Sequence, residues 1–181
     1  LQYASSSSVY GDTKDFSETA QCHPQTPYAW SKYLFDRWVF QQEQHIMVQG
    51  FRYFNVYGKN SKKGHFLGDQ IDKIKNGIFS VIGSHETRSF CYVSDAVRAS
   101  IYVAENCNRE LVNVGNDREI SIGEAVQVIA TVMGHPDAQF EQLPSMPGSV
   151  ANRRPDITKL RSIMPDYEPM SFEEGIRSIL S

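Results

Sequence analysis

The sequence has few cysteines, no long apolar run and no excess of basic charge, and each absence excludes a class of protein. Cys22, Cys91 and Cys107 are an odd number at irregular spacing without a Cys-x-x-Cys pair, so they indicate neither a disulfide framework nor a zinc site. A reducing, cytoplasmic compartment is therefore expected. No apolar run approaches the roughly 20 residues that span a bilayer, so we expect no membrane segment.

Charge and histidine spacing exclude further functions. A formal net charge of -3 and a pI near 6.0 give no basic field that would attract nucleic acid, so an anionic ligand would need a few well-placed arginines. No metal site is expected, because the histidines are scattered without the spacing of metal ligands. They are His23, His45, His65, His85 and His135.

What the 181 residues do contain is an alternation of strand and helix patterns. Helices are expected over 28–44, 67–76, 94–105 with Ser94 as cap, 122–133 after a capping box at Ser121, and from the box at Ser171 onward. Strands are expected over 1–4, 48–57, 79–82, 88–93 and 111–114. Such alternation predicts an α/β fold with crossover connections. Because the chain opens in mid-pattern at Leu1 without a methionine, we expect it to be a fragment.

A tyrosine and a lysine stand four residues apart at the start of the longest predicted helix. Tyr28 and Lys32 would project from one face, a single turn apart, so the ammonium would favour the phenolate form of the tyrosine. Lowering a tyrosine pKa from about 10 to about 7 takes roughly 4 kcal/mol, which a lysine, a bound nicotinamide cation and partial burial can supply together. The alternative is an ordinary surface pair on an amphipathic helix.

The same spacing also occurs by chance in a chain of this composition. Tyr10 and Lys14 are separated by Gly11, Asp12 and Thr13, which form a turn signal. A spacing of four within a turn places no side chains on a common face. The Tyr-x-x-x-Lys pattern therefore predicts chemistry only where it falls on a helix.

Six segments occur together in one order along the chain: YASSSSVYG at 3–11, PYAWSK at 27–32, FRYFNVYG at 51–58, RSFCYVSD at 88–95, RRPDITK at 153–159 and FEEGI at 172–176. Together they resemble the extended short-chain dehydrogenase/reductases, which include the nucleotide-sugar epimerases and dehydratases. The resemblance covers essentially the whole chain and lacks only the family's N-terminal part.

The resemblance implies the C-terminal part of a Rossmann-like doubly wound parallel sheet with a smaller α/β substrate-binding lobe. Residues 1–65 would complete the dinucleotide-binding domain, and residues 66–181 would form most of the lobe, with some segments returning to the main sheet. The family's glycine-rich phosphate loop is absent, since no Gly-x-x-Gly-x-x-Gly occurs here. The implied cofactor is NAD, with NADP as the alternative, and this chain alone should bind it poorly or not at all.

The resemblance also assigns three catalytic roles. Tyr28 matches the general base and acid, and Lys32 matches the residue that lowers its pKa and holds the nicotinamide ribose, so both would contact the cofactor. Ser6, four residues before Tyr10, matches the catalytic hydroxyl residue that hydrogen-bonds the reacting sugar oxygen. The alternative for the serines at 5–8 is a hydroxyl-rich strand end.

Three further residues match substrate contacts in the family. Asn55 matches a contact to the sugar nucleotide, with a strand-terminal asparagine that satisfies backbone groups as the alternative. Arg88 and Arg153 match positions that clamp the diphosphate, a task suited to guanidinium groups, with surface solvation as the alternative. Arg154 would replace Arg153 if the matching were displaced by one residue.

Departures from the family pattern narrow the chemistry. Ser7 and Ser8 stand where the 4,6-dehydratases carry an acidic pair, and related decarboxylases keep a glutamate at the second of these positions. Lys59 stands where a proline is frequent in the family, so we expect the loop before the lobe to differ from the family pattern. Epimerisation or carbonyl reduction of a nucleoside-diphosphate sugar is then expected.

UDP-hexose 4-epimerisation is the first expectation. An ADP-heptose 6-epimerase, a keto-sugar reductase and a non-catalytic binding module on a degenerate dehydrogenase fold are the alternatives. Members of the family are commonly dimers through the Tyr-Lys helix, which would place Trp38 and Phe40 in an interface; core burial is the alternative for both.

Overall fold

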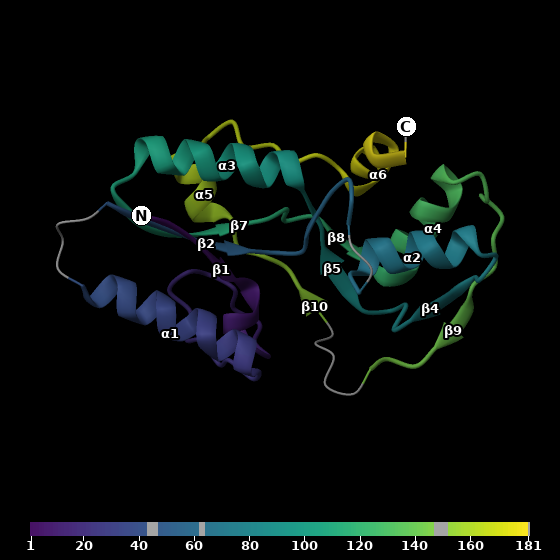
Figure 1. Cartoon of the computed structure of the whole chain (residues 1–181), viewed down its shortest axis with the longest axis horizontal. Coiled ribbons are helices and arrows are strands. Elements are labelled where there is room, and N and C mark those ends of the chain that lie inside the picture. Colours follow the sequence, from purple (N-terminus) through teal and green to yellow (C-terminus); the bar gives the residue numbers. More distant parts are fainter. Residues whose placement is uncertain (43–46, 62–63, 147–151, 181) are drawn as a thin grey trace.

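The computed structural model describes residues 1–42, 47–61, 64–146 and 152–180. Its main sheet is parallel and has the strand order β1-β2-β7, formed by Gln2–Ser6, Val48–Tyr53 and Arg109–Val114. Helix α1 (Pro27–Gln41) covers one face, and α3 (Val93–Asn106) and α5 (Thr158–Ile163) cover the other (Figure 1). Helices on both faces of a parallel sheet confirm the predicted doubly wound α/β class.

Helix α1 begins where local sequence predicts it. The hydroxyl of Thr26 accepts a hydrogen bond from the backbone N–H of Ala29 at 3.1 Å, and Pro27 occupies the first helical position, where it needs no hydrogen-bond partner. The predicted helix is confirmed as far as Gln41. Its predicted continuation is wrong at Gln42, which is the extended C-cap residue, and residues 43–44 lie outside the described part.

The strand predicted over 48–57 is wrong as a single element. β2 ends at Tyr53, and after Asn55, whose φ is 39°, the chain resumes as β3 (Val56–Tyr57) in a different sheet beside β6 (Cys91–Tyr92). Asparagine tolerates this left-handed conformation better than most residues, and the turn carries the chain out of the main sheet.

The strand predicted over 88–93 is also divided, into β5 (Thr87–Ser89) and β6. The predicted cap at Ser94 is wrong, because α3 already begins at Val93 and its N-cap residue, Tyr92, makes no side-chain cap. The strand simply turns directly into the helix, without the capping hydroxyl that the pattern indicated.

The remaining elements form a lobe beside the sheet (Figure 1). Its helices are α2 (Phe66–Lys75), α4 (Ile122–Val132) and α6 (Phe172–Leu180), and its paired strands are β4 (Ser80–Ile82) with β9 (Glu141–Leu143), and β10 (Asn152–Arg153) with β5 and β8 (Glu119–Ser121). Both predicted capping boxes are confirmed: Ser121 and Glu124 bond reciprocally, as do Ser171 and Glu174.

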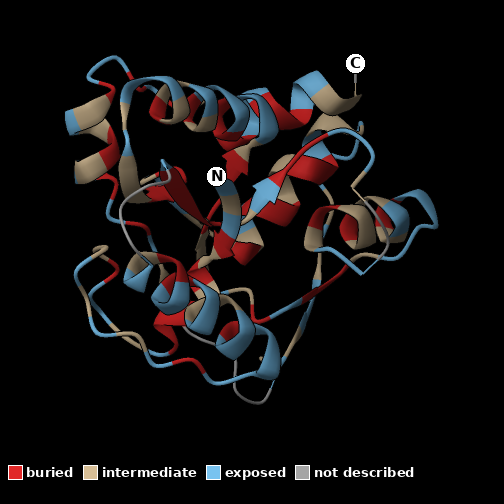
Figure 2. Ribbon diagram, turned by 60° about the vertical axis from the view of Figure 1, so that its left-hand side comes forward, coloured by how far each residue is buried: buried red, intermediate tan, exposed pale blue. Residues whose placement is uncertain are grey.

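Buried apolar side chains form separate clusters in the two parts. One cluster in the lobe joins α2, α4 and α6, and another joins the main sheet to α3 and α5. A small third cluster lies around the 3-10 helix η1 (Ser7–Tyr10). Figure 2 shows burial concentrated along the strands and exposure on the outer faces of the helices.

The predicted boundary between the two parts at residue 65 stays a prediction. Strand β7, which belongs to the predicted second part, residues 66–181, lies in the main sheet.

None of the helices in the described part is both long and apolar enough to cross a bilayer.

Candidate active site

Tyr28 and Lys32 lie together at the start of α1. The Lys32 ammonium is 5.7 Å from the centroid of the Tyr28 ring and donates a hydrogen bond to the backbone carbonyl of Ala4 at 2.8 Å. The Tyr28 side chain is 57% exposed. The helical spacing thus places a cation beside an accessible phenol and ties that turn of the helix to β1.

Ser6 ends β1, two residues after the carbonyl that Lys32 contacts. Its hydroxyl oxygen accepts hydrogen bonds from the backbone N–H of Ser8 at 3.2 Å and from the Ser8 hydroxyl at 2.9 Å, and so caps η1. Because Ser6 accepts in both bonds, its own proton is left for a further acceptor. The expected strand-end role and an available donor therefore coexist in one residue.

The buried face of α1 carries a charge that the sequence analysis missed. Asp36 accepts hydrogen bonds from Tyr3 Oη at 2.9 Å and Ser5 Oγ at 3.0 Å, and from Arg52 Nε at 3.1 Å. The side chains of Asp36 and Arg52 are only 3% and 5% exposed. Burial, and then the charge of Asp36, raise the pKa of Tyr3.

This network fixes how α1 sits on the sheet, since it joins the helix to both β1 and β2. Asp36 lies one turn beyond Lys32, so the ion pair sets the rotation of the helix that presents Tyr28. Two sequence signals existed: an aspartate four residues after the lysine, and an arginine inside an apolar strand. The guanidinium of Arg52 also lies 4.8 Å from the Tyr10 ring centroid.

Tyr10 and Lys14, the second pair with the Tyr-x-x-x-Lys spacing, lie in the same region. Tyr10 is fully buried at the end of η1 and donates to Asn113 Oδ1 at 2.8 Å. Burial is the main reason that its pKa is raised to about 12. Lys14 lies outside any helix, so this Tyr-x-x-x-Lys spacing brings no ammonium onto the phenol.

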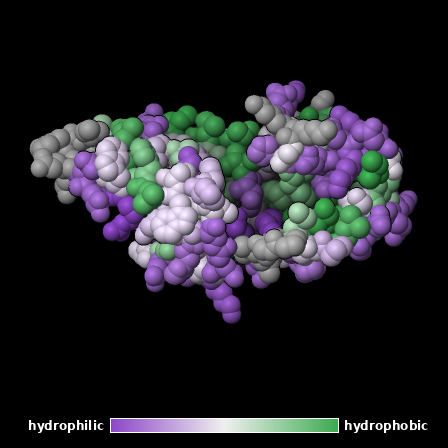
Figure 3. Space-filling view, turned by 60° about the horizontal axis from the view of Figure 1, so that its bottom comes forward, coloured by the Kyte–Doolittle hydropathy of each residue, from purple (hydrophilic) through white to green (hydrophobic). Residues whose placement is uncertain are grey.

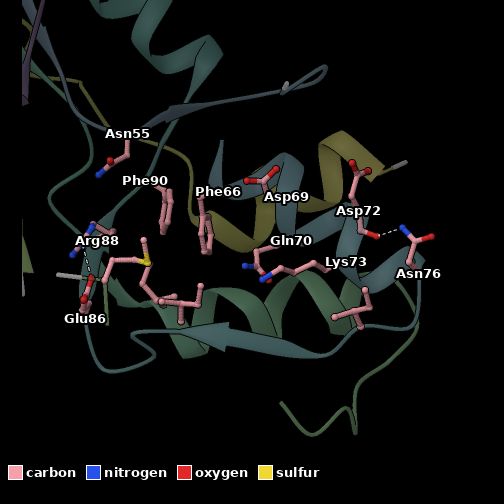
Figure 4. A pocket seen from close by; sticks show the side chains of 14 residues that line it. Asn55, Phe66, Asp69, Gln70, Asp72, Lys73, Asn76, Glu86, Arg88 and Phe90 are labelled. Atoms are coloured by element: carbon pink, nitrogen blue, oxygen red, sulfur yellow. Dashed lines mark hydrogen bonds and ion pairs between the residues drawn. The ribbon is translucent and has the colours of Figure 1, made fainter. Parts of the chain in front are cut away.

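Asn55 and Arg88 line a cavity of about 710 Å³ between α2 and the lobe strands. Aromatic walls are supplied by Phe66 and Phe90, and Figure 4 shows both rings between Arg88 at one end and Asp72 at the other. The space-filling view in Figure 3 shows the molecule hollowed where its two parts meet. An apolar-walled cavity with a few charged groups is the usual form of a small-molecule site.

The amide of Asn55 serves the backbone. Its Nδ2 donates to the carbonyl of Ser89 at 2.9 Å, which is the strand-terminal role weighed against ligand binding. Parallel pairing places Ser6 beside Tyr53, so Asn55 follows just beyond the same edge of the sheet. The structure therefore brings the catalytic candidates and the cavity to neighbouring strand ends, although Ser6, Tyr28 and Lys32 do not line this cavity.

The two predicted arginines are adjacent. β5 and β10 are parallel, with Arg88 and Arg153 in register. Arg88 donates from Nη2 to Glu86 Oε2 at 2.7 Å and from Nη1 to the Thr87 carbonyl at 2.7 Å. Burial, and then the charge of Arg88, lower the pKa of Arg153. Arg154 instead lines a different cavity of about 660 Å³.

No group of three or more His, Cys, Asp or Glu side chains suited to a metal occurs within the described ranges.

A parallel sheet with helices on both faces, a Tyr-x-x-x-Lys helix on one of them and an arginine-bearing cavity beyond the strand ends define a dehydrogenase-like class of α/β protein. A family model described as "NAD dependent epimerase/dehydratase family" matches residues 1–115. The chain belongs to this family, whose cofactor is NAD.

Solved structures agree with this membership. A UDP-N-acetylglucosamine 4-epimerase from Methanobrevibacter ruminantium, in complex with UDP-N-acetylmuramic acid, is 27% identical with a TM-score of 0.86. A UDP-glucose 4-epimerase from Thermotoga maritima with UDP-glucose is 25% identical with a TM-score of 0.88. A UDP-glucuronic acid 4-epimerase from Bacillus cereus, with UDP-glucuronic acid and NAD, is 26% identical with a TM-score of 0.84.

These matches cover 99% of this chain but 61%, 61% and 59% of the respective neighbours. The chain therefore spans about three fifths of the length of the enzymes it resembles.

Proposed function

We propose that these residues carry proton transfer and substrate binding for the NAD-dependent epimerisation of a nucleoside-diphosphate sugar, with a UDP-hexose 4-epimerase as the first assignment. The observation that carries the proposal is the Lys32 ammonium, which is anchored on β1 beside the exposed ring of Tyr28 and two residues from Ser6. UDP-sugar 4-epimerases among the structural neighbours support the choice of substrate.

The Tyr28 phenolate, stabilised by Lys32, removes the proton from a sugar hydroxyl. Ser6 donates its hydroxyl proton as a hydrogen bond to the same oxygen and steadies the keto sugar. Tyr28 later returns its proton to that oxygen, after the sugar has presented its other face. NAD, when bound, supplies a hydride acceptor that gives the hydride back, so the net redox change is zero.

The residues present fit only one end of that cofactor. Tyr28 and Lys32 offer donors to the nicotinamide ribose from the start of α1, where Lys32 contacts the edge strand β1. The sequence offers no glycine-rich loop for the pyrophosphate, and the neighbours extend well beyond the matched region. NAD is preferred to NADP because the cofactor is regenerated in each cycle.

The diphosphate of the substrate is assigned to Arg88 and Arg153, and its sugar end to Asn55. Guanidinium groups in a desolvated site make strong, often bidentate hydrogen bonds to phosphate. In this assignment residues 1–65 hold the proton-transfer groups, and residues 66–181 supply most of the substrate lobe.

The test is turnover by the full polypeptide that contains these residues, supplied with NAD and assayed with UDP-galactose, UDP-N-acetylhexosamines and ADP-heptose. Interconversion of UDP-glucose and UDP-galactose is the expected result. Turnover of ADP-heptose would move the assignment to a 6-epimerase. No turnover of any substrate, with Tyr28 intact and the protein folded, would contradict epimerisation and favour a binding module.

We also place a homodimer contact on α1. Trp30, Leu34, Phe35 and Trp38 are exposed along this helix, whereas Phe40 is half-buried against the Arg109 guanidinium. Sedimentation measurements should give a dimer that Trp38→Glu dissociates, and a monomeric wild-type protein would contradict this contact.

We also assign the protein to the cytoplasm. Its three unpaired cysteines agree with a reducing compartment.

A further inference from the structure

Two like charges lie side by side on neighbouring strands, and one of them, Arg88, lines an end of the 710 Å³ cavity. Arg88 and Arg153 are Cα partners in the parallel pair formed by β5 and β10, and the Arg88 side chain is only 18% exposed. Arg153 Nε is buried and has no hydrogen-bond partner, and within the described part no ion pair neutralises this residue. Like charges directly opposite each other destabilise a strand pair, so the site favours any nearby anion.

The carboxylate of Glu86 forms an ion pair with Arg88 at this site. Glu86 Oε2 lies 2.7 Å from Arg88 Nη2, and the Glu86 side chain is 9% exposed. Its backbone is held on both sides, because the Glu86 N–H donates to the Gly83 carbonyl at 2.9 Å and the Glu86 carbonyl accepts from Ile122 N at 2.8 Å. The carboxylate is therefore fixed on the cavity wall, as Figure 4 shows.

The neighbouring backbone is shaped to admit this carboxylate. Gly83 has a φ of 60°, and a Cβ built on it would lie 2.8 Å from Glu86 Oε1. A side chain at position 83 would therefore crowd Glu86 as well as strain the turn. Glycine at this position keeps room for Glu86 beside Arg88.

We propose that Glu86 is a specificity-determining residue that sets how strongly the Arg88 end of the cavity holds a phosphate or diphosphate. It occupies one nitrogen of the guanidinium and cancels its charge, so a bare anion gains little there. A larger ligand still binds, because it adds contacts to the aromatic walls. This inference rests on the proposed function in that the physiological anion is the diphosphate of a nucleotide sugar.

The test is equilibrium binding of inorganic pyrophosphate and of UDP, measured by titration calorimetry at low and at physiological salt. Glu86→Gln keeps the size of the side chain and an acceptor for Arg88 but removes the charge. A buried charge a few ångströms from the bound anion should matter strongly, so Glu86→Gln should lower the dissociation constant of pyrophosphate at least about tenfold, with a steeper salt dependence.

The matched control is Glu119→Gln on β8, the other neighbour of β5. Glu119 undergoes the same charge change and keeps its acceptor for Thr87 Oγ1, but it is exposed and does not line this cavity. Its effect should stay within about twofold, because solvent screens an exposed charge. Equal gains in both variants would contradict a specific role for Glu86.

A double-mutant cycle with Arg88→Gln shows whether Glu86 acts through Arg88. The gain from Glu86→Gln should disappear when residue 88 is glutamine, and a gain that persists would overturn the proposal. If Glu86→Gln alone fails to fold, recovery of folding by Arg88→Gln supports the charge balance, whereas no recovery contradicts it.

The readout does not depend on catalysis. A tenfold gain in a protein that epimerises no sugar would support the role of Glu86 while the proposed function fails. Wild-type protein and Glu86→Gln that both leave millimolar pyrophosphate unbound would overturn the inference, whatever the turnover assays show.

Discussion

The region around α1 and the region around the cavity hold their charged groups in opposite ways. At α1 the exposed Tyr28 and the half-buried Lys32, proposed as the proton-transfer pair, lie above the buried ion pair of Asp36 and Arg52. At the cavity the charges themselves are sheltered, next to the ring of Phe90.

The two tasks proposed for these regions account for this difference. Groups that exchange protons with a substrate and lie against a cofactor need access, so accurate placement must come from contacts below them. Groups that bind a diphosphate gain strength from exclusion of water, so they lie in the walls of a cavity. The lobe is held mainly by apolar and aromatic packing, with the rings of Phe90 and Phe172 4.7 Å apart.

The largest effect is expected on turnover at the exposed reactive group. Tyr28→Phe should reduce turnover of the full polypeptide by about 10² to 10⁴, the usual contribution of a general acid-base residue. The melting temperature should hardly change, because the side chain is exposed. Tyr33→Phe on the same helix is the control. Retained activity in Tyr28→Phe would show that Tyr28 is not the general acid-base residue.

The largest effect on stability is expected beneath the helix. Asp36→Ala leaves the Arg52 guanidinium buried without its carboxylate, which should cost about 3–5 kcal/mol in the free energy of unfolding. Urea titration measures this loss, and Asp72→Ala on the exposed face of α2 should change stability by less than about 0.5 kcal/mol. Similar losses in the two variants would show that the ion pair does not hold α1.

A smaller loss is expected in the apolar core of the lobe. Ile129 is fully buried in α4, and Ile129→Val should cost about 0.5–1.5 kcal/mol because only one methylene is removed. Affinity for UDP should remain unchanged, which titration calorimetry would check. A large loss of affinity would mean that the cavity depends on exact packing as strongly as α1 depends on its ion pair.

The smallest effect is expected at a half-buried carboxylate on the sheet side. Burial raises the pKa of Glu18, whose Oε1 accepts from the Asn113 N–H at 2.7 Å. A raised folded-state pKa gives a contribution to stability that is complete below the unfolded pKa, about 4.3, and is lost as pH rises through the folded value. Glu18→Gln should therefore flatten this decline in urea titrations across the weakly acidic range; an unchanged slope would assign the decline to other groups.

Local sequence was sufficient where the determinants are near neighbours. The start of α1 follows from Thr26 and Pro27, and the shared face of Tyr28 and Lys32 follows from helical spacing alone. The capping boxes and the parallel α/β class follow in the same way from short patterns. Tyr10 and Lys14 share no helical face, as the turn signal between them in the sequence predicts.

The tertiary structure alone decided which distant residues meet. The burial of Asp36 against Arg52, the break of the strand at Asn55 and the register of Arg88 beside Arg153 each depend on how separate strands assemble. A helix bonds to itself within one turn, so its sequence encodes it locally, whereas a strand takes its partners from remote segments. That is why the shared face of Tyr28 and Lys32 was visible in the sequence and the charge balance around Glu86 was not.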